Sequence, residues 1–496
     1  MKVLFIYPNL GGSVGFNIGL AMLSAQLKRG GHETKLIHLN ESLGSPLDFN
    51  NIEKTVLDYN PGLIGISVNT NQYPIGIDIS RFLKSRGIDA PIVFGGIHPT
   101  LNPEKTLENP YVDMVVVGEG EGAILDLANS LEREKNVFNI DNLWLKVDGK
   151  IRKNKLRKLI SLEDHFFMDV DLFENFKKIT DLKNGWAEVI LGRGCPFNCN
   201  YCFNDAYRKT YRKYGQEGDI KNYIRNGDYD VTLQGIIRMK DRFKNITCFS
   251  FVDDDFLIDR NSLQFIRRYK QEVDLPFVIN TTVQSIDEEK LKALKAGGCD
   301  LLRIGIESGN ENIRKEVLNR NVGNEAIIQK IRLARSKGLR VLTYNLIGLP
   351  NETREIIIET LKINLECGTD LVKMATFYPY EGTKIYSLCK EKGLINEESQ
   401  ETTLTYFDRS ILNFDESYKA DLSRMQNYFD VYLNYHDIRL MPYYREIMAK
   451  IERLPVNNLD NSEIKKEIEI ISRDLSCKGI EHYALKYTSF LAVKVK

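Results

Sequence analysis

Short apolar runs alternate with amphipathic helical segments twice along this chain of 496 residues, and no other feature restricts the fold as strongly. The first apolar runs are rich in Val, Ile and Leu, which is typical of parallel strands buried on both faces. Helical segments such as GLAMLSAQLKRG lie between them and end on Gly30 and Gly31, which can cap a helix in the left-handed conformation. The predicted strands are residues 3–7, 34–38, 63–68, 92–94 and 114–117. Residues 1–140 are therefore predicted to form a doubly wound, Rossmann-like α/β domain.

The segments that follow these strands are rich in glycine and small polar residues, and we call them the strand tips. They are PNLGGSVGFN, SVNTNQ, GGIHPT and GEGEG. Ligands of doubly wound sheets bind in the crevice beyond the carboxyl ends of the strands. We therefore expect a ligand to lie across these tips.

The second series of strands begins near residue 185. Six β/α units predict a partial (β/α)6 TIM-like barrel over residues 185–394, with its site at the carboxyl ends of the strands. Residues 141–184 lack sustained periodicity and are interpreted as a linker with a strand pair, whose basic run IRKNKLRK is a solvated face. Tyr-rich amphipathic patterns predict a helical C-terminal domain over residues 395–496, with most of its tyrosines serving as packing residues. The predicted barrel strands are residues 188–191, 247–252, 278–281, 301–306, 340–347 and 371–377.

The charge balance and the apolar runs exclude several classes of protein. Lys and Arg number 68, as do Asp and Glu, so no general attraction to nucleic acid or anionic lipid is expected. No apolar run approaches the ~20 residues of a membrane span, and the first run is too short for a signal peptide. Eight cysteines are too few for a disulfide scaffold in so long a chain. We predict a cytoplasmic protein whose partner is a small molecule or another protein.

Three of the cysteines are crowded into the segment LGRGCPFNCNYCFN, directly after the first barrel strand. Cys195, Cys199 and Cys202 have the spacing Cys-x3-Cys-x2-Cys, which lets three thiolates converge on one metal centre. A structural zinc site would require a fourth protein ligand, and the other five cysteines stand alone in the sequence. Soft thiolates favour an iron–sulfur cluster, and a [4Fe-4S] cube held by three cysteines leaves one iron open for a substrate or a cofactor.

With this motif the chain resembles the radical S-adenosylmethionine (SAM) enzymes, whose open iron binds the amino and carboxylate groups of SAM. The resemblance implies that the aromatic Tyr201, just before Cys202, touches the adenine. It also implies that FSFVDDDFLID contacts the methionine amino group, with Asp253, Asp254 and Asp255 where many members carry Gly-Gly-Glu. A carboxylate suits an ammonium group, and the sequence leaves open which of the three points inward.

Later barrel strands extend the resemblance. RIGIESGNE resembles the segment that contacts the ribose and the carboxylate of SAM, which implies Glu307 and Ser308 as contacts, with Arg303 beside them. YNLIGLPNET and FYPYEGTKIY resemble the adenine-binding and closing segments. Gly348 in the former would let the backbone approach the purine.

The N-terminal domain resembles the cobalamin-binding domain of one branch of these enzymes, that of the anaerobic magnesium-protoporphyrin ester cyclase and of radical methyltransferases. The segments FGGIHPTLNPEKTLE and VDMVVVGEGEGAI are close to that branch. The resemblance implies space for the nucleotide tail of cobalamin at Gly95 and Gly96, a hydroxyl group from Ser67, and room at the next tip at Gly118 and Gly120.

Two other interpretations of the N-terminal domain stay open. One is an α/β domain with tight turns and no ligand. The other is dinucleotide binding, because Gly11-Gly12-x-x-Gly15 follows a strand and Glu41 lies after the next one. A loose glycine match is weak evidence for this second interpretation.

The chain lacks the Asp-x-His-x-x-Gly motif by which many cobalamin domains supply a histidine to cobalt. His98 lies among the strand tips, but on the loop expected beside the nucleotide tail, so we interpret it as a satisfied surface histidine. The resemblance to relatives without this motif implies that the loop from Asn9 to Asn17 meets the lower face of cobalamin.

These features favour a cobalamin-dependent radical SAM methyltransferase that acts on an unactivated carbon or phosphinate centre of a small metabolite. The resemblance implies that an external electron donor, such as a flavodoxin or a ferredoxin, reduces the cluster, and that the resulting 5′-deoxyadenosyl radical activates the substrate for methylation by methylcobalamin. One alternative is a cyclase or ring-rearranging enzyme of the same branch without methyl transfer. The other is a corrinoid-binding carrier or regulatory protein, in which the cysteine loop has no use.

We expect any one of Cys195→Ala, Cys199→Ala or Cys202→Ala to remove the cluster and all cleavage of SAM, because two thiolates rarely retain a cube whose third ligand is missing. Iron and sulfide analysis and a 5′-deoxyadenosine assay measure the two effects. Cys367→Ala is the control and should change neither. A Cys195→Ala protein that binds four irons and cleaves SAM would contradict the assignment.

Overall fold

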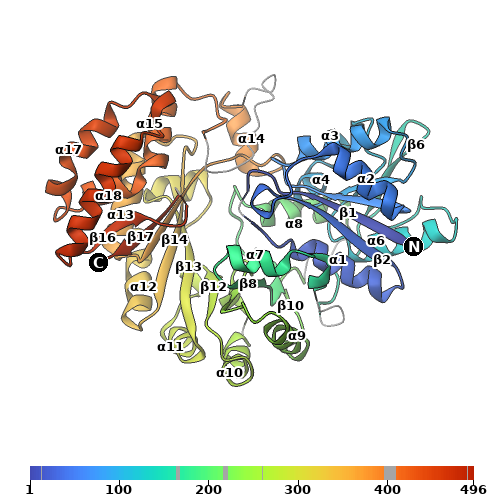
Figure 1. The fold of residues 1–496 in the computed structure, drawn as a ribbon, viewed down its shortest axis with the longest axis horizontal. Coiled ribbons are helices and arrows are strands. Elements are labelled where there is room, and N and C mark those ends of the chain that lie inside the picture. The colour runs from blue at the N-terminus through green and yellow to red at the C-terminus, as the bar shows by residue number, and fades with distance from the viewer. Residues whose placement is uncertain (13, 163–167, 216–221, 260, 396–408, 489) are drawn as a thin grey trace.

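The computed structural model describes the whole chain except residues 13, 163–167, 216–221, 260, 396–408 and 489. Two α/β bodies lie side by side, with the N-terminal sheet on the right of Figure 1 and the barrel strands and C-terminal helices toward the left. Parts of the predicted linker and of the start of the predicted C-terminal domain, 163–167 and 396–408, lie outside the described residues.

The N-terminal sheet contains the five predicted strands, all parallel, in the order β2–β1–β3–β4–β5. Alternate residues of β1 point to opposite faces: Val3 and Phe5 share a core with helices α1 and α6, whereas Leu4 and Ile6 share a core with α2 and α3. The prediction of a doubly wound sheet is therefore confirmed. The elements are β1 Lys2–Pro8, β2 Glu33–Leu39, β3 Leu63–Ser67, β4 Ile92–Gly95, β5 Met114–Val116, α1 Ile18–Arg29, α2 Phe49–Tyr59, α3 Tyr73–Ser85 and α6 Glu121–Glu132.

The strand pair predicted in the linker extends this sheet. Strand β6 (Leu143–Val147) pairs antiparallel with β5, and β7 (Lys150–Lys153) pairs antiparallel with β6. Further along, the ring centroids of Phe173 and Phe16 lie 4.7 Å apart. The segment between the two bodies is thus packed against the N-terminal domain.

The second sheet has the order β16–β17–β15–β14–β13–β12–β11–β8, and its six parallel strands are those predicted. The strand order places β8 at one edge and β16 at the other, in agreement with a partial barrel. Helices connect the parallel strands on the outer side (Figure 1). The elements are β8 Trp186–Val189, β11 Cys248–Phe251, β12 Phe277–Thr281, β13 Cys299–Glu307, β14 Arg340–Ile347, β15 Leu371–Thr376, α9 Tyr229–Arg242, α10 Ser262–Glu272, α11 Glu288–Gly297, α12 Asn324–Ser336 and α13 Arg354–Cys367.

The C-terminal region is helical over most of its described length but ends in two strands that were not predicted. Tyr428, Tyr432 and Tyr444 are buried in a core shared with the barrel helix α13, as expected for packing residues. The LAVKV segment alternates apolar and polar residues with the period of a strand. It forms strand β17, which pairs antiparallel with β15. No helix of the described part is both long and apolar enough to cross a membrane. The elements are α15 Glu416–Asn427, α16 Phe429–His436, α17 Met441–Glu452, α18 Ser462–Cys477, β16 His482–Leu485 and β17 Leu491–Val495.

Helix α8 (Phe203–Tyr214) follows the cysteine loop of the barrel but packs into the N-terminal domain (Figure 1). Tyr207 and Tyr211 belong to the apolar core that contains Val117 and Trp144. The ring of Tyr214 lies edge-on to Trp144, with 4.8 Å between the centroids. The helix therefore attaches the cysteine loop to the N-terminal sheet.

A buried carboxyl group closes the turn between β14 and α13 and makes stability depend on pH. Glu352 Oε2 accepts hydrogen bonds from the N–H groups of Gly348 and Leu349, at 2.6 and 3.1 Å. Burial raises the pKa of Glu352 from its ordinary value of 4.5 to about 8, although these two donors oppose the shift. The raised pKa means that its contribution to stability is complete below pH 4.5 and is lost as the pH rises through about 8.

We expect Glu352→Gln, whose amide stays neutral, to remove this part of the pH dependence. Urea unfolding of both proteins at about pH 5 and about pH 8.5 measures it. The stability difference should move in favour of the variant at the higher pH. The other titrating groups are the same in both proteins, so their effects cancel in the stability difference. A difference that is the same at both pH values would contradict the raised pKa of Glu352.

Candidate active site

The three cysteines of the motif line one cavity of about 720 Å³ at the carboxyl end of the barrel. They lie between strand β9 (Gly192–Arg193) and α8, where Cys202 Sγ accepts a hydrogen bond from the N–H of Asn204 at 3.4 Å. Burial raises the pKa of the Cys195 thiol to about 12 and that of Cys202 to about 11. Metal binding, which deprotonates a coordinating thiol outright, is the interaction that would offset this cost.

The donor set suits a cluster better than a single ion. Among the described residues, no three His, Cys, Asp or Glu side chains are placed to hold one metal ion together. Three soft sulfur donors nevertheless share one cavity wall, and thiolates are the ligands of iron–sulfur clusters. The cysteine loop therefore fits a [4Fe-4S] cluster.

The structure distinguishes the three consecutive aspartates. Asp254 lines the cysteine cavity. Asp253 accepts hydrogen bonds from the N–H groups of Leu191 and Gly192, at 3.0 and 2.6 Å, and so holds the turn before the cysteine loop. Asp255 accepts from three hydroxyl groups, Thr281, Thr282 and Ser285. Asp254 is thus the carboxylate that faces the cavity.

Glu307 lines the same cavity and is held by two partners. Tyr201 OH donates to Glu307 Oε1 at 3.0 Å, and Arg320 Nη1 lies 3.4 Å from that oxygen and 3.0 Å from the tyrosine hydroxyl. Burial raises the pKa of Glu307, and the Arg320 guanidinium opposes the shift. Glu307 also has a φ of +69°, a conformation that costs energy in a residue with a side chain and is found mainly at functional sites.

Arg303 and Tyr201 also line the cysteine cavity, whereas Ser308 and Gly348 are absent from its lining. Arg320 is a lining residue that the sequence analysis missed. It lies 13 positions after Glu307, beyond the end of the strand, so no strand-tip pattern marked it. Its pairing with a carboxylate at a strand end could be recognised only from the fold.

A second cavity, of about 470 Å³, lies between the strand tips and the barrel. The predicted residues that line it are Asn17, Ser67, Gly95, Gly96, Gly118 and Gly120. A Cβ atom added to Gly95 would meet nothing within 4 Å, so this glycine leaves open space. Gly118 has a φ of +86°, and a Cβ there would lie 2.5 Å from Tyr211 OH, so α8 can approach this tip only where glycine stands. The cavity fits the placement predicted for cobalamin.

Two residues of the N-terminal domain lie differently from what was expected. Asn9 is buried and absent from the lining of the second cavity, and its carbonyl oxygen accepts from Asn40 Nδ2 at 2.9 Å. His98 is not a surface residue: it is only 3% exposed and stacks on Tyr73 with 4.1 Å between the ring centroids. Burial lowers the pKa of His98 to about 4. Tyr73 and His98 belong to different segments of the sequence, so the pattern of residues gave no indication that their rings stack.

The two cavities adjoin. Asn204, Val252 and Asp254 contribute to the walls of both. Asn204 stands on the first turn of α8, and the other two residues follow strand β11. A ligand in either cavity therefore faces these three residues.

The fold and the adjoining cavities define a two-domain α/β protein with a cysteine-lined site at the mouth of a partial barrel. Residues 189–363 match the radical SAM superfamily, and residues 11–128 match the B12-binding domain. The chain thus combines a region that matches radical SAM domains with a region that matches B12-binding domains. The radical SAM domain implies a [4Fe-4S] cluster and SAM as cofactors, and the B12-binding domain implies cobalamin. The B12-binding match also disfavours dinucleotide binding.

The relatives of the chain include proteins named for both predicted reactions. An uncharacterized methyltransferase of Pyrococcus horikoshii is 29% identical over 80% of this chain and 84% of its own length. The anaerobic magnesium-protoporphyrin IX monomethyl ester cyclase of Rubrivivax gelatinosus is 24% identical over 79% of this chain and 70% of its own. The solved structure of the cobalamin-dependent SAM radical enzyme OxsB, with aqua-cobalamin and SAM bound, has a TM-score of 0.64 at 16% identity, over 97% of this chain and 75% of that one.

We expect Arg320→Gln to lower the free energy of unfolding by about 3–5 kcal/mol, because it leaves the Glu307 carboxylate buried without its cation. The double variant Arg320→Gln/Glu307→Gln should recover most of this loss in urea unfolding. Arg335→Gln, which breaks the more exposed pair with Asp370, is a matched control with an expected loss of about 1 kcal/mol or less. Equal stability of the single and double Arg320 variants would contradict the pairing.

We also expect cob(II)alamin in the reconstituted protein to show no nitrogen ligand to cobalt. No histidine lines the second cavity in the part of the chain that the structure describes, and His98 is held in its aromatic stack. Electron paramagnetic resonance reports such a ligand as superhyperfine splitting. Splitting that disappears in His98→Ala would contradict this prediction and identify the ligand.

Proposed function

We propose that the chain is a cobalamin-dependent methyltransferase that methylates an unactivated carbon or phosphinate centre of a small metabolite. The observation that carries the proposal is the shared wall of the two cavities at Asn204, Val252 and Asp254. A substrate between the two cofactor sites would face both, as methyl transfer to an activated centre requires. The relative from Pyrococcus horikoshii, named as a methyltransferase, supports this choice.

When bound, the cluster and SAM supply a 5′-deoxyadenosyl radical, and cobalamin supplies a methyl group. In our proposal Cys195, Cys199 and Cys202 hold the cluster, and the Asp254 carboxylate receives the ammonium group of SAM. Burial raises the pKa of Asp254, and a nearby ammonium would favour its charged form.

Four further side chains complete the proposed SAM site. Arg320 keeps Glu307 in place while leaving it on the cavity wall, through the contacts at 3.0 and 3.4 Å with Tyr201 and Glu307. Glu307 would orient the ribose, and Tyr201 would contact the adenine as well as Glu307. Arg303, deeper in the barrel, lines the same cavity and suits the SAM carboxylate or an anionic part of the substrate.

In the second cavity, Gly95 leaves open space and Ser67 offers a hydroxyl group to the nucleotide tail of cobalamin. Asn17 caps α1 through its side chain, which accepts from the N–H of Leu20 at 3.0 Å, and stands at the same wall. We propose that this end of the loop, and not Asn9, meets the cobalamin ring.

We further propose a cytoplasmic protein that receives electrons from a flavodoxin or a ferredoxin, and that binds no nucleic acid. The cyclase of Rubrivivax gelatinosus favours a second candidate function, a cyclisation or rearrangement without methyl transfer. A corrinoid carrier would have no use for the cavity around the three cysteines.

The methyltransferase proposal predicts that 5′-deoxyadenosine and S-adenosylhomocysteine accumulate in roughly equal amounts, because each turnover uses one SAM as radical source and another as methyl source. The experiment supplies reduced protein with methyl-labelled SAM and a small-molecule extract of the source cells. Label should appear in a new metabolite. 5′-Deoxyadenosine with a cyclised or dehydrogenated, unlabelled product would favour the cyclase, and absence of 5′-deoxyadenosine would favour the carrier.

A further inference from the structure

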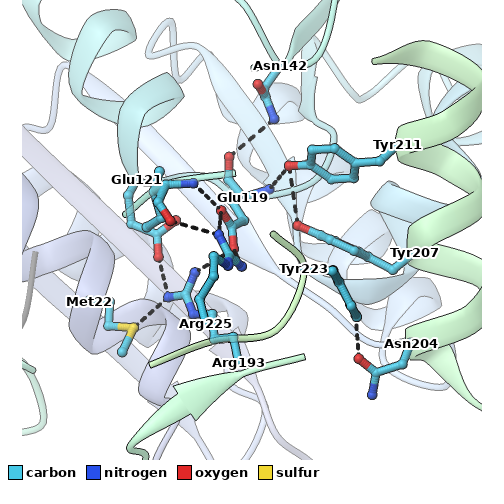
Figure 2. A network of polar contacts seen from close by, with 11 residues as sticks. Met22, Glu119, Glu121, Asn142, Arg193, Asn204, Tyr207, Tyr211, Tyr223 and Arg225 are labelled. Atoms are coloured by element: carbon cyan, nitrogen blue, oxygen red, sulfur yellow. Dashed lines mark hydrogen bonds and ion pairs between the residues drawn. The ribbon is translucent and has the colours of Figure 1, made fainter. Parts of the chain in front are cut away.

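A buried cluster of charged side chains joins the GEGEG tip of the N-terminal domain to the strand that precedes the cysteine loop (Figure 2). Arg225 binds the Glu119 carboxylate with both terminal nitrogens, at 2.6 and 3.0 Å. Arg193 Nη1 lies 3.1 Å from Glu119 Oε1, and its Nη2 pairs with Glu121. We call Glu119, Glu121, Arg193 and Arg225 the interdomain cluster.

The interdomain cluster is almost fully withdrawn from water. The side chains of Glu119, Glu121 and Arg225 are 8%, 7% and 10% exposed, and that of Arg193 is 20% exposed. The N–H of Ile160 also donates to Glu119 Oε2 at 2.9 Å. Removing four charges from water is costly, and such clusters are retained in the best-attested cases because they specify one register of two surfaces.

Glu119 offsets the repulsion between two arginines that face each other in the barrel domain. Arg193 and Arg225 are direct partners in the antiparallel pair of β9 with β10 (Arg225–Asn226). Like charges directly opposite each other destabilise a strand pair, and a two-stranded sheet is marginal on its own. The Glu119 carboxylate contacts both guanidinium groups, so the strand pair depends on an anion from the other domain.

This strand pair determines where the cysteine loop begins. Only Gly194 separates Arg193 from Cys195, and a Cβ atom on Gly194 would lie 2.3 Å from the carbonyl oxygen of Tyr223. The loop therefore starts in close contact with the residues before β10. All four members of the interdomain cluster also line the second cavity.

We infer that Glu119 is a positioning residue that sets the register between the cobalamin site and the cluster site. The inference rests on the proposed function, because that function requires a methyl group to pass between ligands of the two cavities. In the loading step the carbon–sulfur bond of SAM breaks, the methyl group passes to cob(I)alamin, which supplies both electrons of the new bond, and S-adenosylhomocysteine leaves. Methyl transfer needs the reacting atoms of the two cofactors to lie about 3–3.5 Å apart. Formation of 5′-deoxyadenosine, in contrast, uses ligands of the cysteine cavity alone.

The test compares the two products in the holoenzyme without substrate. Wild-type protein and Glu119→Gln are reconstituted with cluster and cobalamin, reduced with titanium(III) citrate and given SAM. We expect S-adenosylhomocysteine and methylcobalamin to form about 10-fold more slowly in the variant, while 5′-deoxyadenosine, iron and cobalamin content stay within about twofold of wild type. Hydrogen–deuterium exchange of the protein before reconstitution should be faster at residues 192–195 and 223–226.

A second ion pair between the domains supplies the control. Lys105 Nζ lies 3.0 Å from Glu381 Oε1, with the lysine 63% exposed, and this pair is away from both cavities. Lys105→Gln should change neither the product ratio nor the exchange at residues 192–195. An equal effect in this variant would overturn the inference, because any weakened interdomain contact would then suffice.

The outcomes separate this inference from the proposed function. If wild-type protein forms 5′-deoxyadenosine but no methylcobalamin, the proposed function fails. If wild-type protein forms both products, and Glu119→Gln forms 5′-deoxyadenosine and methylcobalamin in the same ratio as wild type, Glu119 does not position the two sites. The ratio is unchanged both when the two rates stay the same and when they fall in parallel. Should Glu119→Gln fail to fold, Glu119→Asp keeps the charge on a shorter side chain, and its ratio must then shift in the same direction.

Discussion

The packing of α8 against the N-terminal domain is the interaction on which the arrangement of the site depends. One end of this helix carries Cys202 as its cap, and the tyrosines along it are buried with Trp144 and Val117. Buried aromatic rings contribute large contact areas and specific geometry. Apolar packing of the helix in the N-terminal domain therefore fixes the position of one of the three motif cysteines of the barrel. Because α8 packs against the N-terminal domain, Asn204 on its first turn lies in the walls of both cavities.

Charge at the domain boundary complements this apolar attachment. The chain has no net charge, yet it places two glutamates and two arginines in the wall of the second cavity. Glu307 and Arg320 form a similar buried pair in the wall of the cysteine cavity. Paired charges of this kind contribute little to overall stability compared with apolar packing, but they restrict how the surfaces fit together. The site is thus held by apolar contacts and oriented by ionic ones.

Much of the fold could be predicted from the sequence, because burial on two faces imposes recognisable runs on parallel strands. The five N-terminal strands and the six barrel strands were found in this way, and the cysteine spacing pointed to three residues that line one cavity. The β16–β17 pair was missed because its short segments follow a long helical pattern. The inward-facing aspartate could not be chosen among three neighbours, since only the fold shows that Asp253 is engaged by the N–H groups of Leu191 and Gly192 while Asp254 lines the cavity. Glu119 stood in a segment noted for its glycines, and its partners lie 74 and 106 positions away.

The placement of α8 has a consequence for dissecting the molecule. By sequence the helix belongs to the barrel, but by packing it belongs to the core of the N-terminal domain. A cut near residue 184 would leave the N-terminal fragment with an apolar groove where Tyr207 and Tyr211 pack, and the C-terminal fragment with a helix of exposed aromatic residues. Neither fragment would retain the surface of a separate soluble domain. The two halves are therefore expected to fold as a single unit, even though each matches a family of its own.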